Sequence, residues 1–274
     1  MTTEHEVRTC RIPMSNAESE MPNVCISIVS HLHGDELFQL IEKIELLCVG
    51  TVRQVILTLN VPEPELLEKM GSHSWRFGVK VIENDKPKGF GDNHNSAFQL
   101  TLEKFFCVLN PDIDFDKDPF PDLINTFKDA LTGCAFPVQL GKDGRIQDYI
   151  RQVPSPLALF SRHFGKRIIA REQGKPDWVN AAFMLYDAKI FRLLGGFDER
   201  YFMYCEDVDI CLRLQLAGFK LSQSAAIVVH AAQRNTRKSL KHLKWHVTSL
   251  IRLWISPAYK KFYIHRAALR NKGS

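Results

Sequence analysis

The chain has 274 residues, a length that predicts one domain or one domain with an appendage. Its hydrophobic content of 45% and charged content of 24% are those of an ordinary globular protein with a substantial core. The formal net charge of +5 suits an anionic substrate or a membrane surface without requiring either one.

The cysteines and the hydropathy pattern indicate an intracellular protein. The seven cysteines are scattered, odd in number and without metal-finger spacing, so we expect reduced thiols that pack as small core residues. No secretory signal and no apolar run of membrane-spanning length is visible. We therefore expect a cytoplasmic location, at most peripheral on the inner face of the cytoplasmic membrane.

Apolar runs alternate with helical periodicities along the first half of the chain. Residues 1–22 are polar and are expected to form a flexible tail. Strands are predicted at 24–30, 52–59, 79–82 and 105–109, and helices at 36–47, 62–70 and 93–102. This alternation predicts an α/β fold with a mostly parallel sheet and a ligand crevice at the carboxyl ends of the strands.

Polar residues follow each of the four predicted strands. Each one alone is typical of a turn, because Asn, Asp and Ser favour turns. Four in succession favour a nucleotide crevice. They are Ser30 with His31, Asn60, Asn84 and Asp112.

A glycine-containing loop at 86–95 precedes the third predicted helix. Gly89 and Gly91 would let the backbone approach a ligand, and a helix N-terminus attracts phosphate. The loop is neither Gly-x-Gly-x-x-Gly nor a Walker A sequence. The alternative is a tight loop that needs glycine for steric reasons.

The stretch Asn110-Pro111-Asp112 places a carboxylate at a strand end, where it can hold a divalent cation beside substrate phosphates. The alternative is a Pro-Asp turn. Residues 226–230 form a further short apolar strand that ends in His230. Paired with Asp112, this imidazole would be a second ligand and would suit manganese better than magnesium.

The segment 195–213 runs from a Gly-Gly turn through aromatic residues into an acidic helix start. Glu206, Asp207 and Asp209 could simply complement the helix dipole. Large apolar side chains beside them, however, reduce solvation and can raise the basicity of a carboxylate.

Residues 239–274 interleave basic and apolar side chains. Such a segment can lie on an anionic membrane surface or pack against the domain or a sister subunit, and the sequence leaves both readings open.

These motifs together resemble the family 2, inverting, GT-A-fold glycosyltransferases, in the rhamnosyltransferase-like branch that builds bacterial surface polysaccharides. The resemblance covers residues 24–255, and the Gly-Gly-Phe-Asp…Glu-Asp-x-Asp block at 195–209 is its most specific part. It implies a nucleotide-diphospho-sugar transferase fold over 23–238 with a helical C-terminal appendage over 239–274.

The resemblance also implies roles for individual residues. Asp207 would be the general base, and Asp112 with His230 would hold Mn²⁺ or Mg²⁺. Glu206 and Tyr204 would contact the acceptor. The donor would be bound by Ser30, His31, Asn60, Asn84, Gly89, Gly91, Asn95 and Asn110. Apart from the resemblance, Trp178 could stack on the donor sugar or belong to the core, and Arg234 and Arg237 could clamp the donor phosphates or form a solvated basic loop.

The chain departs from the family pattern at four places. Asn110 replaces the first acid of the metal motif, which implies weaker metal affinity. Ser30-His31 and Asn60 replace residues tied to donor specificity, and Ala181 replaces a glycine beside the sugar pocket. The Gln-x-x-Arg-Trp signature of processive synthases is missing, which favours addition of a single sugar.

The expected function is therefore transfer of one sugar, with L-rhamnose from dTDP-L-rhamnose favoured, to a glycan or lipid-linked saccharide in cell-envelope assembly. Alternatives are a UDP-hexose or UDP-galactofuranose donor, or a catalytically silent sugar- or nucleotide-binding module. Nucleic acid is not an expected partner, because the acidic block would repel phosphate backbones. A homo-oligomer is possible.

Overall fold

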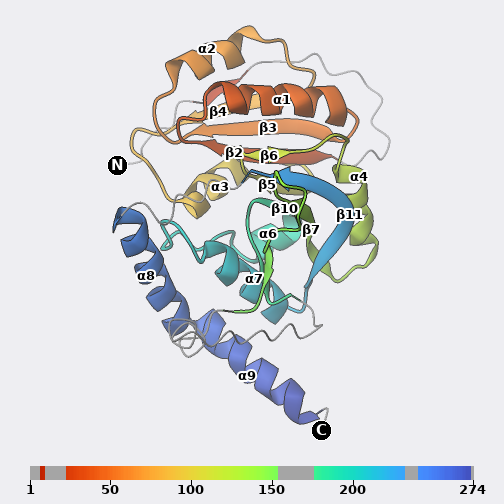
Figure 1. The fold of residues 1–274 in the computed structure, drawn as a ribbon, viewed down its shortest axis with the longest axis vertical. Coiled ribbons are helices and arrows are strands. Elements are labelled where there is room, and N and C mark those ends of the chain that lie inside the picture. The colour runs from red at the N-terminus through yellow and green to blue at the C-terminus, as the bar shows by residue number, and fades with distance from the viewer. Residues whose placement is uncertain (1–6, 10–22, 154–175, 232–239, 273–274) are drawn as a thin grey trace.

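A mixed sheet forms the centre of the molecule (Figure 1). The computed structural model describes residues 7–9, 23–153, 176–231 and 240–272. Within them, nine strands pair in the order β1-β4-β3-β2-β5-β10-β7-β11-β6. They are β1 Val7–Thr9, β2 Val24–Ser30, β3 Val52–Leu59, β4 Gly78–Glu83, β5 Phe105–Leu109, β6 Ile113–Asp114, β7 Thr132–Leu140, β10 Phe183–Asp187 and β11 Lys220–His230. A separate small ribbon pairs β8 (Ile150–Arg151) with β9 (Trp178–Val179).

The first half of the sheet is parallel, as predicted. Strands β4, β3, β2 and β5 run in the same direction, so their carboxyl ends meet at one edge. Strand β10 then lies antiparallel between β5 and β7, and β11 returns parallel to β7. The predicted α/β class is confirmed, with an antiparallel strand inserted at the centre of the sheet.

Helices cover both faces of the sheet. They are α1 Asp35–Cys48, α2 Pro64–Ser72, α3 Phe90–Phe98, α4 Phe120–Asn125, α6 Ala188–Leu193, α7 Glu206–Leu216, α8 Leu240–Ile255 and α9 Pro257–Lys272. A short 3₁₀ turn, Thr126–Lys128, follows α4.

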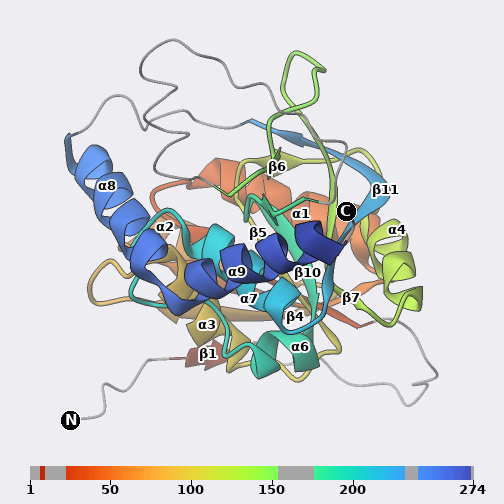
Figure 2. The same ribbon diagram turned by 90° about the horizontal axis from the view of Figure 1, so that it is seen from below.

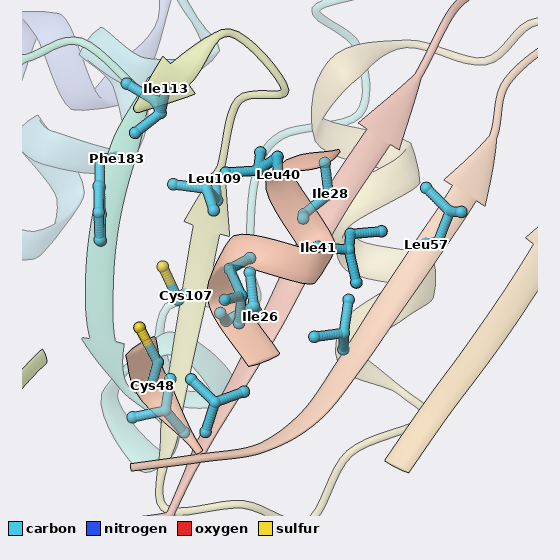
Figure 3. Close-up of a cluster of buried hydrophobic side chains, with 14 of the residues drawn as sticks. Ile26, Ile28, Leu40, Ile41, Cys48, Leu57, Cys107, Leu109, Ile113 and Phe183 are labelled. Carbon is cyan, nitrogen blue, oxygen red and sulfur yellow. The ribbon is translucent and has the colours of Figure 1, made fainter. Parts of the chain in front are cut away.

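One hydrophobic core lies between α1 and the parallel strands (Figure 3). Leu37, Leu40, Ile41 and Ile44 recur every three or four residues, so they share one face of α1, and all four are buried. That face packs on β2, β3 and β5. Strand β5 is buried along its whole length because helices cover both of its faces, and it is apolar throughout.

A second core lies on the opposite face, under α3, α6 and α7. Its centre is a group of aromatic rings in edge or tilted contact, with centroids 4.7–5.7 Å apart: Phe98, Phe106, Tyr186, Phe191 and Phe197. These contacts join α3 to the Gly-Gly turn at 195–196, so the second core sets the position of the chain that leads into α7.

Some elements differ from the predicted boundaries. The third predicted helix begins at Phe90 rather than residue 93, because the glycine loop itself enters the first helical turn. Strand β11 begins at Lys220, six residues before the predicted start. Val7–Thr9, within the segment expected to be a tail, pair with β4, and the rest of that segment lies outside the described residues.

The two C-terminal helices lie on the outside of the domain (Figures 1 and 2). Helix α9 packs against α7, and Arg266 of α9 forms an ion pair with Asp177 at 2.7 Å. Helix α8 packs against residues 201–204, just before α7. In the parts of the chain that the structure describes, no helix is both long enough and apolar enough to span a bilayer.

Candidate active site

A strained backbone segment comes immediately before α7 in the chain. Tyr204 and Cys205 have φ angles of 71° and 66°, a left-handed conformation that side chains rarely adopt. Each such residue costs about 1–3 kcal/mol and persists only where surrounding contacts enforce it. This segment turns the chain so that Glu206 and Asp207 open the helix.

Asp207 combines partial exposure with a raised basicity. Its Oδ1 accepts a hydrogen bond from the Val208 amide at 2.8 Å. Burial raises the pKa of Asp207 to about 6, against the lowering effects of the Val208 and Ala181 amides and of the Arg151 guanidinium. A carboxylate with a pKa near neutral pH that substrate can still reach is suited to act as a general base.

Glu206 is the neighbouring carboxyl group and is buried. Burial raises its pKa well above the ordinary value, and the negative charge of Asp207 raises it further. Its Oε2 makes no hydrogen bond among the described residues. Burial therefore favours the neutral form of Glu206, whereas Asp207 ionises more readily, which gives the two adjacent acids different chemical roles.

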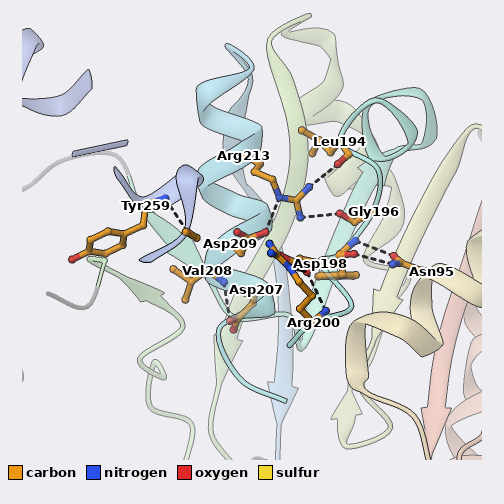
Figure 4. Close-up of polar contacts among 12 residues, drawn as sticks. Asn95, Leu194, Gly196, Asp198, Arg200, Asp207, Val208, Asp209, Arg213 and Tyr259 are labelled. Atoms are coloured by element: carbon orange, nitrogen blue, oxygen red, sulfur yellow. Dashed lines mark hydrogen bonds and ion pairs between the residues drawn. The ribbon is translucent and has the colours of Figure 1, made fainter. Parts of the chain in front are cut away.

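Asp209, by contrast, holds the local structure together (Figure 4). Its carboxylate accepts from Arg213 Nε at 2.7 Å. The same guanidinium donates to the carbonyl oxygens of Leu194 and Gly196 at 2.7 and 2.9 Å. The Asp209–Arg213 ion pair holds the Gly-Gly turn against α7 and so fixes the chain segment that leads to Asp207.

Asn95 also serves this turn. Its Nδ2 donates to the Phe197 carbonyl at 2.9 Å, and its Oδ1 accepts from the Phe197 amide at 2.9 Å. Both ends of the amide are used, so Asn95 lies against the Gly-Gly segment although the sequence predicted a donor contact.

Asp112 and His230 are brought together, as the predicted metal pair requires. Asp112 Oδ1 lies 3.4 Å from His230 Nε2, and both side chains are largely buried. The pairing of β6 with β11 creates this contact, and the Ala231 amide donates to the Asp112 carbonyl at 2.9 Å. His230 Nδ1 is buried without a hydrogen-bond partner in the described residues.

These two donors fit a divalent cation. A carboxylate oxygen and an imidazole nitrogen are ligands that manganese accepts, and substrate phosphates and water complete such sites. The described residues contain no cluster of three or more His, Cys, Asp or Glu side chains that could hold a metal alone. Binding would therefore depend on the diphosphate as well as on Asp112 and His230.

One turn links the metal pair to Asp207. The Asn110 amide donates to the Ala182 carbonyl at 2.8 Å, and the adjacent Ala181 amide faces the Asp207 carboxylate. Residues 181–182 thus contact both the Asn110-Pro111-Asp112 segment that follows β5 and the start of α7. The partly exposed Asn110 side chain lies on this edge as predicted.

Asn60 and Asn84 form a buried amide network that shapes the glycine loop. Asn84 Nδ2 donates to Asn60 Oδ1 at 2.9 Å and to Asn93 Oδ1 at 2.7 Å. Asn60 in turn accepts from the Lys88 amide at 2.8 Å and donates to its carbonyl at 3.1 Å. Asn60 directly follows β3 and Asn84 directly follows β4, as expected, and this network holds Lys88 in place.

Gly89 and Gly91 are explained by close packing. A Cβ at Gly89 would lie 2.8 Å from the Phe202 carbonyl oxygen, and one at Gly91 would lie 2.6 Å from Phe197 Cβ. The steric alternative weighed from the sequence therefore accounts for both glycines. The consequence is that the loop at 86–91 contacts the segment that leads to Asp207.

The turn after β2 borders a pocket of about 490 Å³, lined by residues 31–36 with Glu65 and Leu66. Ser30 is buried and its Oγ accepts from the His33 amide at 3.3 Å, whereas His31 is exposed. Glu63, which the sequence did not single out, accepts from the amides of Leu32 and Gly34 at 2.9 and 3.0 Å.

Trp178 and Tyr204 lie on either side of α7. Trp178 is buried, donates from Nε1 to the Gln152 carbonyl at 3.0 Å, and carries the Arg151 guanidinium over its ring at 5.3 Å. Tyr204 is partly exposed, and its hydroxyl lies 2.8 Å from His242 Nδ1 of α8. Arg234 and Arg237, predicted to clamp phosphates, lie outside the described residues.

Sequence reasoning missed Arg151, whose charge acts on Asp207 from the β8–β9 ribbon. No local signal identified it, because two-residue strands have no periodicity to read. Arg213 could have been found, since Asp209 and Arg213 have the i, i+4 spacing of an ion pair on a helix.

The fold is that of the GT-A glycosyltransferases. Two solved structures of that kind superpose on the chain. A Pyrobaculum calidifontis mannosyltransferase in complex with GDP-Man and Mn²⁺ matches with a TM-score of 0.64 at 11% identity, over 92% of this chain and 70% of that one. GalNAc-T7 with UDP, GalNAc and Mn²⁺ matches with 0.63 at 17%, over 88% of this chain and 50% of that one.

Sequence relatives narrow the class. Rhamnosyltransferase WbbL of Escherichia coli is 30% identical over 84% of this chain and 91% of its own length. An N-acetylglucosaminyl-diphospho-decaprenol L-rhamnosyltransferase of Mycobacterium tuberculosis is 29% identical over 62% of this chain and 61% of its own length. No protein-family model matches. The chain belongs to the GT-A glycosyltransferase family that includes WbbL, and it is a glycosyltransferase similar to rhamnosyltransferases.

Proposed function

We propose that the protein adds a single sugar, with inversion, from a nucleotide-diphosphate sugar to a glycan or lipid-linked saccharide. The favoured donor is dTDP-L-rhamnose, because two relatives are rhamnosyltransferases by name. The observation that carries the proposal is Asp207, a partly exposed carboxylate with a pKa of about 6 on the same sheet edge as Asp112 and His230.

In the proposed reaction, Asp207 accepts the proton of the acceptor hydroxyl. The hydroxyl oxygen forms a bond to the anomeric carbon, and the bond from that carbon to the diphosphate oxygen breaks with its electron pair leaving on the diphosphate. Attack from the face opposite the leaving group inverts the configuration. Glu206, held neutral, would orient the acceptor beside Tyr204 without adding a second negative charge.

Asp112 and His230 would hold a divalent cation, which would supply charge stabilisation to the departing diphosphate. The donor would lie along the carboxyl ends of β2 to β5. Ser30, His31 and Asn110 border that edge, while Asn60, Asn84, Gly89, Gly91 and Asn95 would act indirectly, by shaping the loop and turn around it. Arg234 and Arg237 would neutralise phosphate charge.

An acceptor carried on a lipid would place the enzyme on the inner face of the cytoplasmic membrane, in contact through residues 239–274. The name of the mycobacterial relative includes such a lipid-linked sugar, which supports this choice of acceptor class.

The test is thermal unfolding and donor hydrolysis across a panel of nucleotide sugars, each with and without Mn²⁺ or Mg²⁺. A bound donor raises the melting temperature by mass action even without acceptor. We expect dTDP-L-rhamnose to give the largest metal-dependent shift, and Asp112→Asn to abolish the metal dependence. A larger response to a UDP-hexose would replace the donor, and no response to any nucleotide sugar would favour a silent binding module.

A further inference from the structure

We propose that one face of α8 is a docking surface for an anionic lipid bilayer. This outer face consists of apolar side chains that recur every three or four residues and are 47–86% exposed: Leu240, Leu243, Val247, Ile251 and Ile255. A continuous apolar stripe on a helix at the edge of a protein is typical of an interfacial helix.

The opposite face of α8 already holds the helix on the catalytic domain. Trp245 packs on Phe202 with ring centroids 4.7 Å apart, and Ser249 Oγ donates to the Met203 carbonyl at 2.8 Å. Leu253 is fully buried. The outer face is therefore not needed to attach the helix, and its apolar residues are available to a partner.

The distribution of charge identifies the partner. Residues 1–209 contain all 31 acidic residues but only 23 of the 36 Lys and Arg, whereas residues 210–274 contain 13 cations and no acid. Lys244, Lys260 and Lys261 of α8 and α9 are exposed. An exposed apolar stripe combined with exposed lysines on the same pair of helices matches anionic headgroups above an acyl layer.

The same distribution disfavours a second copy of the chain as the occupant. A two-fold dimer through the outer face would bring identical surfaces together, so the lysines of the two copies would face one another. Like charges at close range repel, whereas anionic headgroups would neutralise them.

Helix α8 lies next to the segment that leads into Asp207. Its inner face contacts residues 202–204, which lead directly into Asp207. A bilayer on the outer face would therefore lie next to the segment where the acceptor is proposed to bind. This inference rests on the membrane contact proposed above for residues 239–274 and specifies its surface, and the binding itself needs neither donor nor metal.

The experiment is flotation of the full chain with vesicles of phosphatidylcholine, alone or mixed with phosphatidylglycerol, in the absence of nucleotide sugar. We expect binding to the mixed vesicles only, and weakening with added salt. The variant L243E/V247E/I251E should lose binding. The matched control L46E/L102E/L193E changes three exposed leucines outside α8 and should bind like the unmodified chain.

A second variant tests the charges without touching the apolar stripe. K244Q/K260Q/K261Q should weaken binding on the order of 100-fold, whereas K117Q/K128Q/K142Q should leave it unchanged. Thermal unfolding checks that each variant is folded.

Failure of the unmodified chain to float, or equal binding by the outer-face variant, would overturn the proposal. So would a dimer in light scattering that only the outer-face variant dissociates, because the face would then join two copies. Since no donor is present, none of these outcomes bears on the proposed transferase reaction.

Discussion

At the scale of single residues, the central feature is the difference in environment between two adjacent acids, Glu206 and Asp207. Glu206 is buried and kept neutral, while Asp207 retains exposure and hydrogen bonds from backbone amides. Ionising two adjacent carboxyl groups in a poorly solvated place is unfavourable. The negative charge is therefore favoured on Asp207, the more exposed of the two.

Asp207→Asn removes the proposed base but keeps the shape of the side chain. Because positioned proton transfer is worth about 10²–10⁴-fold, kcat should fall by at least that lower factor while donor binding persists. Steady-state rates and donor-induced melting shifts measure the two effects. Asp122→Asn, an exposed acid on α4, is the control, and near-normal turnover by Asp207→Asn would refute the assignment.

The same residue predicts a pH dependence. A base must be deprotonated to act, and burial raises the pKa of Asp207 to about 6. The rate should therefore be constant above that pH and fall about tenfold per unit below it. A profile of kcat/KM against pH measures this limb. A rate that stays level through pH 6 would show that another group takes the proton.

At the scale of elements, α3 packs tightly against the turn before α7. Gly91→Ala would place a methyl group 2.6 Å from Phe197 Cβ, which forces the turn away from the helix. Overpacking of this kind typically costs about 1–3 kcal/mol. Urea unfolding should show that loss for Gly91→Ala.

Gly71→Ala is the matched control, because a Cβ there has no neighbour within 4 Å and the residue lies inside α2. It should leave stability unchanged or raise it by about 0.5–1 kcal/mol. Equal effects at both glycines would mean that packing on Phe197 is not what requires Gly91.

Helix α8 should show a strong contrast between its two faces. Leu253 is fully buried and Leu243 is half exposed. Leu253→Ala should destabilise the protein by about 2–5 kcal/mol, whereas Leu243→Ala should stay within about 0.5 kcal/mol. Denaturant unfolding followed by tryptophan fluorescence measures both. A small effect of Leu253→Ala would mean that α8 is not part of the cooperative unit.

The elements also show what the sequence could predict. Strands such as Val24–Ser30 and Val52–Leu59 were predicted to the residue, because a buried strand between polar turns is an apolar run that needs no other information. The insertion of β10 between β5 and β7 could not be predicted, since pairing partners are set by the whole sheet. For the same reason, no local pattern indicates that Arg151 acts on Asp207.

The candidate site was partly predictable for a physical reason. Asp112 comes just after one predicted strand and His230 ends another, so their types and positions suggested a pair, and β6–β11 pairing brings them together. Gly91 was linked to the donor because a glycine loop before a helix is typical of phosphate binding, and Asn95 was linked to it by the family resemblance. Their actual contacts are with Phe197, more than 100 positions along the chain, which local patterns do not reveal.

At the scale of the whole molecule, Glu206 links the site to stability. The folded protein keeps this carboxyl protonated, with its pKa raised well above the ordinary 4.5, while the unfolded chain ionises it. The contribution of Glu206 to stability should therefore fall as the pH rises above 4.5. Glu206→Gln removes that cost, so its advantage in melting temperature should grow with pH.

Melting curves of both proteins from about pH 5 to about pH 8 test this, within the range where ordinary Glu is ionised. Glu68→Gln, on the exposed side of α2, controls for the loss of one charge. A Glu206→Gln variant whose advantage is independent of pH would contradict a neutral Glu206 in the folded state.

The strand order also has a consequence for synthesis of the chain. Strand β5 is fully buried between β2 and β10, but Phe183, the first residue of β10, follows Leu109 by 74 residues. At roughly 5–20 residues per second, the ribosome takes roughly 4–15 s to make that interval. During those seconds the growing chain presents the unpaired edge of an entirely apolar strand, which is the kind of edge that pairs with other chains. The nascent enzyme is thus most prone to aggregate midway through translation, and that is when a chaperone would have its greatest effect on yield.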